Sequence, residues 1–234
     1  MIEAEWWEYD SFDELADAVA GDIGFIIESA VDARNASLIA VPGGDPAPRI
    51  FARLAAQKLP WKRVTVIPTD DRVVAIDNEL ANVREIAQTF LPTGARVIPI
   101  VSGAAEDYRL AGNAADARLQ DLPWPPDLVW LGMGQDGHTA SLFAGPDLQD
   151  ALDAPKARRA VGLRPDPLPQ DAPVARVTLT RAAILSARTV LITITGQDKR
   201  DLLEQAIADG QSSKLPIGRV LAEAEQPIDI HWCA

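Results

Sequence analysis

The stretch LIAVPGGDPAPRIFARLAAQKLPWKRVTVI, residues 38–67, contains the pattern that decides the fold. It begins with a short apolar run at 38–41, which ends at the turn residues Pro-Gly-Gly at 42–44. A helical pattern follows over about 48–58, and a second apolar run at 64–67 closes the stretch. Two runs of strand length joined by a helix predict a βαβ unit with parallel strands.

The same alternation continues on both sides of this stretch. Upstream, Ser11 and Glu14 match a helix capping box, and apolar residues then recur at helical spacing to about Asn35. Downstream, we expect helices at 80–90, 104–119, 198–208 and 217–224, and strands at 97–98, 128–131, 177–179, 190–194 and 228–232. Strands separated by helices predict an α/β fold, a doubly wound and mostly parallel sheet with helices on both faces.

One segment departs from the alternation. Residues 144–175 contain prolines at 146, 155, 165, 167, 169 and 173 and show neither period clearly. We interpret this segment as an irregular excursion on one side of the sheet, not as a linker, and expect a single domain over 1–234.

Composition and charge limit the possible partners. The chain has 34 acidic and 22 basic residues and a net charge of −12, a field that repels nucleic acid and anionic lipid surfaces. A small anionic ligand requires a locally basic cleft. No apolar run approaches the ~20 residues of a membrane-spanning helix. The single cysteine, Cys233, and the acidic N-terminal residues give no sign of secretion, so we expect a cytoplasmic protein.

In doubly wound sheets ligands bind beyond the carboxyl ends of the strands, so the loops after strands are the candidate sites. Gly43 and Gly44 suit a backbone that approaches an anion closely, although a tight turn explains them equally. The segment 69–72, TDDR, offers carboxylates and a guanidinium for acid/base chemistry or phosphate binding, or forms a solvated loop.

The loop at 132–139, GMGQDGHT, formally matches the dinucleotide fingerprint G-x-G-x-x-G. That fingerprint normally opens the first βα unit, whereas four such units precede it here, so we do not expect a dinucleotide. The loop instead carries His138 with Asp136 close to it in sequence. Such a pair suits general-base catalysis, and the alternative is that His138 has only a structural role. His138 and His231 are the only imidazoles, and neither has a Cys or His at ligand spacing, so we expect no metal site.

A lysine occupies an unusual position in the last of these loops. Lys199 falls in the first turn of an expected helix, where the helix dipole disfavours a cation. An anionic ligand beside the helix would explain this placement, and a surface ion pair is the alternative.

Together these loops resemble one family, the 6-phosphogluconolactonases, within a group that also contains glucosamine-6-phosphate deaminases. The most specific segment is LGMGQDGHTASLF at 131–143, because Thr139, Ser141 and Leu142 favour lactonase over deaminase. Segments that resemble further lactonase motifs are TDDR at 69–72 with Asn82, RVTLT at 176–180, and TGQDK at 195–199.

The resemblance implies a Rossmann-like, NagB-type sugar-phosphate fold and hydrolysis of 6-phospho-D-glucono-1,5-lactone to 6-phosphogluconate in the oxidative pentose phosphate pathway. It implies no metal or organic cofactor, a small-molecule phosphosugar lactone as partner, and a monomer. His138 would act as base and then acid, oriented and polarised by Asp136 and Asp70. The implied substrate-binding residues are Gly43, Gly44, Arg72, Asn82, Gly134, Gly137, Thr139, Arg176 and Lys199, with Arg72, Arg176 and Lys199 holding the phosphate.

The chain departs from the family at the glycine loop. Asp45 and Pro46 follow Gly44, where the family has hydroxyl residues that donate to the phosphate. A carboxylate facing a phosphate is repulsive, so we expect Asp45 to cap the next helix instead. The alternatives are a non-catalytic sugar-phosphate binder, a lactonase of altered specificity, or a glucosamine-6-phosphate deaminase or isomerase.

Overall fold

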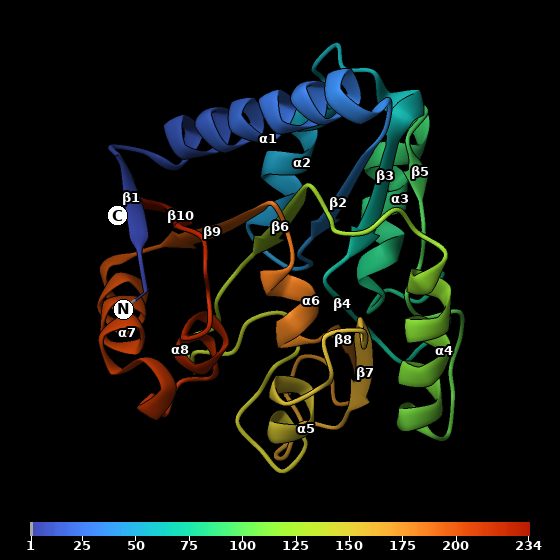
Figure 1. Cartoon of the computed structure of the whole chain (residues 1–234), viewed down its shortest axis with the longest axis vertical. Coiled ribbons are helices and arrows are strands. Elements are labelled where there is room, and N and C mark those ends of the chain that lie inside the picture. The colour runs from blue at the N-terminus through green and yellow to red at the C-terminus, as the bar shows by residue number, and fades with distance from the viewer. Residues whose placement is uncertain (1) are drawn as a thin grey trace.

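The computed structural model describes residues 2–234 and is built around a parallel sheet of seven strands in the order β1-β10-β9-β6-β2-β3-β5 (Figure 1). Every neighbouring pair in this sheet is parallel. The strands are β1 (Ala4–Tyr9), β2 (Ser37–Val41), β3 (Val64–Pro68), β5 (Arg96–Val97), β6 (Leu128–Leu131), β9 (Thr189–Thr195) and β10 (Ile228–Cys233).

The strand order reverses direction once along the chain. From β2 the chain adds β3 and β5 on one side, then returns to place β6 on the other side of β2, followed by β9 and β10. Parallel sheets form their ligand sites at such a switch point, beyond the carboxyl ends of the strands. The loops that follow β2 and β6 are therefore neighbours at this edge of the sheet.

Helices cover both faces of the sheet, because successive strand residues point to opposite sides. In β2, Ile39 and Val41 join a core formed with the first three helices, whereas Leu38 and Ala40 join a core formed with the later ones. Figure 1 shows α1 along one face of the sheet and α6, α7 and α8 on the opposite side. The helices are α1 (Phe12–Arg34), α2 (Ala47–Ala55), α3 (Asn82–Phe90), α4 (Tyr108–Gln120), α5 (Leu148–Leu152), α6 (Arg181–Leu185), α7 (Gln197–Asp209) and α8 (Pro216–Leu221).

The strand expected at 177–179 is present, but it belongs to a second sheet that was not predicted and that lies below the first in Figure 1. This sheet contains β4 (Asp70–Arg72), β8 (Arg176–Leu179) and β7 (Ala160–Leu163), paired antiparallel in the order β4-β8-β7. We interpreted 69–72 as a loop and 144–175 as irregular, and neither is fully correct. Strands as short as these show almost no period in sequence and are stabilised by their partners.

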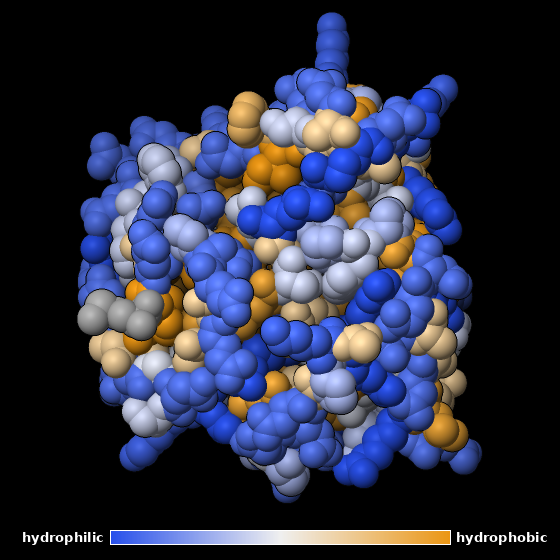
Figure 2. Space-filling view, viewed as in Figure 1, coloured by the Kyte–Doolittle hydropathy of each residue, from blue (hydrophilic) through white to orange (hydrophobic). Residues whose placement is uncertain are grey.

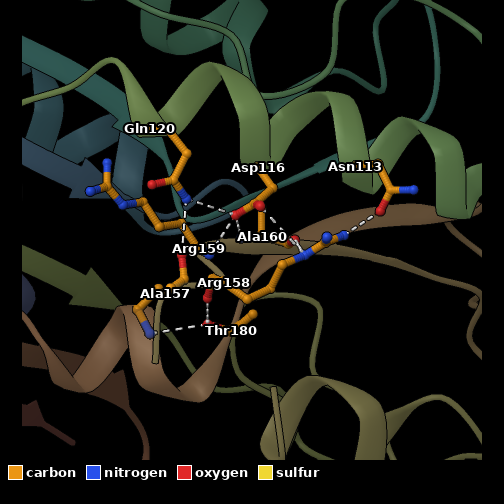
Figure 3. Close-up of polar contacts among 9 residues, drawn as sticks. Asn113, Asp116, Gln120, Ala157, Arg158, Arg159, Ala160 and Thr180 are labelled. Atoms are coloured by element: carbon orange, nitrogen blue, oxygen red, sulfur yellow. Dashed lines mark hydrogen bonds and ion pairs between the residues drawn. The ribbon is translucent and has the colours of Figure 1, made fainter. Parts of the chain in front are cut away.

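Side chains from α4 hold the proline-containing excursion in place (Figure 3). Asp116 accepts hydrogen bonds from the backbone N–H groups of Arg159 and Ala160, and Gln120 donates to the carbonyl of Ala157. On the other side, Thr180 donates to the carbonyl of Arg158. These hydrogen bonds join the excursion to α4 and to the start of α6.

Two glycines allow α4 to approach β7 at backbone distance. A Cβ atom on Gly112 would lie 1.9 Å from the amide nitrogen of Gly162, and one on Gly162 would lie 1.7 Å from the carbonyl oxygen of Tyr108. Such distances are impossible for any larger residue without movement of the backbone. The helix and the strand can pack this closely only because both positions are glycine.

The α/β fold class is confirmed, and most expected elements lie within a few residues of the predicted bounds. Ser11 caps α1 by accepting from the N–H of Glu14, and Asn35 ends the helix in the left-handed conformation. The helix expected from 104 begins at Tyr108, because Asp107 provides its N-cap. The strand β1 and the short helices α5 and α6 were not predicted.

Hydrophilic residues cover most of the face in Figure 2, consistent with the many acidic residues of the chain. Within residues 2–234, no helix combines the length and the apolar character that crossing a bilayer requires.

Candidate active site

A pocket of about 260 Å³ lies at the switch point between β2 and β6, slightly smaller than the range of about 300 to 1,000 Å³ that is usual for small-molecule sites. The loops after β2 and β6 line it, together with residues of the second sheet, the starts of α3 and α7, and the proline-containing excursion. Nine of the residues expected from the sequence line it: Gly43, Gly44, Asp70, Arg72, Asn82, Gly134, His138, Arg176 and Lys199. These residues span more than 150 positions of sequence and meet because parallel strands end at the same edge.

The imidazole of His138 is oriented by two neighbours. Its Nδ1 lies 2.5 Å from Oδ1 of Asp136, which leaves Nε2 free for a substrate or water. Its ring stacks on Phe143 with the centroids 4.1 Å apart. Burial raises the pKa of Asp136, but the hydrogen bond and charge of His138 outweigh burial, so the pKa lies below its ordinary value. Asp136 is therefore a carboxylate that can stabilise an imidazolium ion.

Three further residues of the loop were expected to bind substrate. Gly134 lines the pocket with its backbone, whereas Gly137 and Thr139 do not line it. Gly134 donates its N–H to the carbonyl of His138, and a Cβ there would lie 2.2 Å from the imidazole. Gly137 has a φ of +76° and packs against Leu215, while Thr139 donates to the carbonyl of Gly132. Gly137 and Thr139 are not among the residues that line the pocket, so they shape the loop that presents His138.

Asp70 lines the pocket but has a different neighbour from the one expected. Its carboxylate accepts hydrogen bonds from Ser141 at 2.5 Å and from Thr69 at 3.1 Å. Among residues 2–234 it makes no hydrogen bond to His138, whose partner is Asp136. The expectation that Asp70 orients His138 directly has no support in these contacts.

Asp71 acts as a structural anchor behind the pocket. Its carboxylate accepts from the backbone N–H groups of Arg72, Asn82 and Val83, which ties β4 to the start of α3. Burial raises its pKa to about 6, although these three hydrogen bonds oppose the shift. The side chain of Asn82 in turn donates to the carbonyl of Asp70 and contacts Arg72, so it positions the guanidinium.

The three expected cations, Arg72, Arg176 and Lys199, all line the pocket. Arg176 is 2% exposed, and burial followed by the charge of Arg72 lowers its pKa. Burial likewise lowers the pKa of Lys199, and the negative charge of Asp45 partly offsets that effect. The pocket thus contains desolvated positive charges, which favour an anionic ligand.

The structure contradicts our expectation for Asp45. The helix α2 begins at Ala47, its N-cap residue is Pro46, and no side chain caps it. Because Pro46 occupies the N-cap position, Asp45 lies one residue before it and its carboxylate does not accept from the N–H groups of the first turn. Asp45 lines the pocket instead.

Sequence reasoning gave no site role to Ser141, Phe143 and Asp171, which also line the pocket. Ser141 and Phe143 lie in the segment quoted for the resemblance, and their spacing from His138 is a signal that could have identified them. Asp171 comes from the proline-containing excursion, where no local pattern marks it. Within the described residues, no group of three or more His, Cys, Asp or Glu side chains could hold a metal ion.

Residues 10–232 match the family described as glucosamine-6-phosphate isomerases/6-phosphogluconolactonase. The chain belongs to this family. Within the glucosamine-6-phosphate isomerase/6-phosphogluconolactonase family, it is 36% identical over 222 residues to a 6-phosphogluconolactonase of Rhizobium meliloti strain 1021, covering 93% of this chain and 94% of that protein.

Two further relatives extend this comparison. A 6-phosphogluconolactonase of Mesorhizobium japonicum is 36% identical over 236 residues, covering 97% of this chain and 94% of that protein. The crystal structure of a 6-phosphogluconolactonase from Shewanella baltica superposes with a TM-score of 0.89 at 29% identity, covering 99% of this chain and 98% of that one. The similarity therefore extends over nearly the whole chain and its fold.

Proposed function

We propose that this chain hydrolyses 6-phospho-D-glucono-1,5-lactone to 6-phosphogluconate, a step of the oxidative pentose phosphate pathway. The observation that carries the proposal is the placement of His138, paired with Asp136, in one pocket with Arg72, Arg176 and Lys199. Lactone opening needs a base for water and a proton for the leaving oxygen, and a phosphate ester needs cations. The two curated relatives are named for this activity.

The geometry at His138 supports general-base catalysis. Asp136 occupies Nδ1, so Nε2 remains to take a proton from water as the water oxygen bonds to the lactone carbonyl carbon. The resulting imidazolium is stabilised by the charge of Asp136. When the bond between the carbonyl carbon and the ring oxygen breaks, His138 returns the proton to that oxygen, and the product is a carboxylic acid that ionises in water.

The cations bind the other end of the substrate. Arg72 and Arg176 lie on adjacent strands of the second sheet, and Lys199 lies in the first turn of α7. A phosphate ester carries a charge between about −1.5 and −2 at pH 7, so these groups can hold it away from the reacting carbonyl. Binding at a distance fixes the lactone relative to His138, which lowers the entropy cost of the reaction.

The assembly and location follow from the same proposal. The family resemblance supports a monomer, and the metabolic role of the proposed reaction supports a cytoplasmic location. Light scattering during size-exclusion chromatography measures the assembly directly, and a mass near 25.2 kDa is the expected result.

The decisive experiment measures hydrolysis of freshly generated 6-phosphogluconolactone above its spontaneous opening. The wild-type chain and His138→Ala are compared side by side at equal concentration. We expect the substitution to lower kcat roughly 10²-fold or more, the usual contribution of a general base. An unchanged kcat would remove His138 from the mechanism, and a wild-type rate equal to the spontaneous rate would refute the proposed function.

A further inference from the structure

The charges that line the pocket are balanced, which is unexpected for a site that binds a phosphate ester. Three cations, Arg72, Arg176 and Lys199, face the pocket together with three carboxylates, Asp45, Asp70 and Asp171. Because a phosphate ester carries nearly two negative charges, a pocket selective for it gains from an excess of positive charge. This pocket has no such formal excess.

The cations differ in how far they are already engaged. Arg176 donates from both terminal nitrogens to the carbonyls of Val174 and Ala172, and Arg72 contacts Asn82. Lys199 has no ion pair or side-chain hydrogen bond among residues 2–234, and it is half-buried in the wall of the pocket. Lys199 is therefore the cation whose donors are most available to a ligand.

Asp45 is the carboxylate that acts on Lys199. Both residues line the pocket, and the negative charge of Asp45 raises the pKa of Lys199 against the larger lowering effect of burial. Unlike Asp70, which accepts hydrogen bonds from Ser141 and Thr69, Asp45 accepts no hydrogen bond within the described residues. Among these residues, its carboxylate oxygens therefore remain free of hydrogen bonds beside Lys199 and act on a ligand that Lys199 binds.

From this arrangement we infer that Asp45 limits the selectivity of the site for phosphate, so that the chain also hydrolyses aldonolactones that carry a neutral hydroxyl in place of the phosphate ester. A phosphate bound at Lys199 is repelled by Asp45, whereas a hydroxyl there can donate a hydrogen bond to the carboxylate. The inference rests on the proposed function, since it concerns the substrate range of the same site.

The test compares kcat/KM for 6-phosphogluconolactone and for D-glucono-1,5-lactone, each corrected for spontaneous opening. We expect wild type to accelerate both reactions, and Asp45→Asn to raise the ratio of phosphorylated to neutral substrate about tenfold. That is the size of the repulsion between a unit charge and a dianion about 6 Å apart in water. Asp45→Glu keeps the charge and should leave the ratio within about threefold of the wild-type value.

The matched control is Asp198→Asn, which makes the same change in net charge at an exposed position next to Lys199 in sequence but outside the pocket lining. It should leave the ratio unchanged. Three results overturn the inference: no wild-type acceleration with the neutral lactone, the same ratio for Asp45→Asn and wild type, or the same ratio for Asp45→Asn and Asp45→Glu.

A second readout separates this inference from the proposed function. Calorimetry gives the Kd of 6-phosphogluconate and of gluconate for each folded variant without any turnover. If wild type hydrolyses neither lactone, the proposed function fails, yet Asp45→Asn should still tighten 6-phosphogluconate about tenfold relative to gluconate. Should Asp45→Asn not fold, Asp45→Ser removes the same charge and carries the same expectations.

Discussion

Arg72 and Arg176 lie directly opposite each other in the antiparallel ladder of β4 and β8. Like charges in this position repel, and burial adds to the cost, because Arg176 is nearly inaccessible to solvent. Both side chains line the pocket. The fold thus holds two guanidinium groups together at a free-energy cost that a bound anion removes.

This repulsion predicts a ligand-dependent effect of Arg72→Gln. Without ligand, the substitution should change the free energy of unfolding by no more than about 1 kcal/mol, since lost contacts offset relieved repulsion. With 6-phosphogluconate at 100 times its Kd, wild type should gain about 2.7 kcal/mol and a Tm higher by several degrees. At the same concentration the variant should gain much less, as measured by thermal unfolding.

The control for this experiment is Arg96→Gln, an exposed arginine in β5 outside the pocket lining. Its response to 6-phosphogluconate should equal that of wild type. An equal rise in Tm for Arg72→Gln and wild type would mean that Arg72 does not bind the phosphate.

The pair of Asp136 and His138 predicts a separation between kcat and KM. Asp136→Asn should lower kcat at least tenfold, because an amide cannot stabilise the imidazolium. KM should change little, since Asp136 does not line the pocket. Steady-state kinetics measure both constants. Asp150→Asn, at an exposed position without side-chain bonds among residues 2–234, serves as the control, and a raised KM with unchanged kcat would contradict the assigned role.

His231 predicts how stability depends on pH. Burial lowers its pKa to about 4, against 6.5 in the unfolded chain, and its ring accepts or donates a hydrogen bond with Tyr9. The unfolded state binds the proton more tightly, so this contribution is present above pH 6.5 and lost as the pH falls toward 4. Between pH 7 and pH 5 the loss is about 2 kcal/mol.

The measurement is urea unfolding of wild type and His231→Phe at both pH values. The phenyl ring preserves stacking on Tyr9, and the variant lacks the titration. A comparison with the variant is required because Asp71, with a pKa raised to about 6, contributes in the opposite direction over this range. If the difference in free energy of unfolding between the two proteins is the same at pH 7 and pH 5, His231 is not the titrating group.

Two helical glycines predict opposite effects of one substitution. A Cβ on Gly21, in α1, meets nothing within 4 Å, so Gly21→Ala should stabilise the protein by about 1 kcal/mol through helix propensity. A Cβ on Gly112, in α4, would overlap the backbone of Gly162, so Gly112→Ala should destabilise it by about 2 kcal/mol or more. Urea unfolding of both variants checks the signs, and a stabilising Gly112→Ala would show that α4 and β7 pack less closely.

Elements with local signals could be predicted from the sequence. Ser11 and Glu14 mark the start of α1, Asn35 marks its end, and the apolar run at 128–131 coincides with β6. The loop after β6 also identified His138 and Asp136 as a pair. In each case the interacting groups are close in sequence, so composition and spacing carry the information.

The α/β alternation, the family and the loops that contain the site could be predicted from the sequence alone. Three contacts could not: the pairing of Arg72 with Arg176, the hydrogen bond from Ser141 to Asp70, and the position of Asp45 in the pocket lining instead of at the cap of α2. The first two contacts join residues about 70 to 100 positions apart, and the third depends on which residue takes the cap. Local propensity does not encode such contacts, because they form only when the second sheet and α7 pack beside the carboxyl ends of the strands of the first sheet.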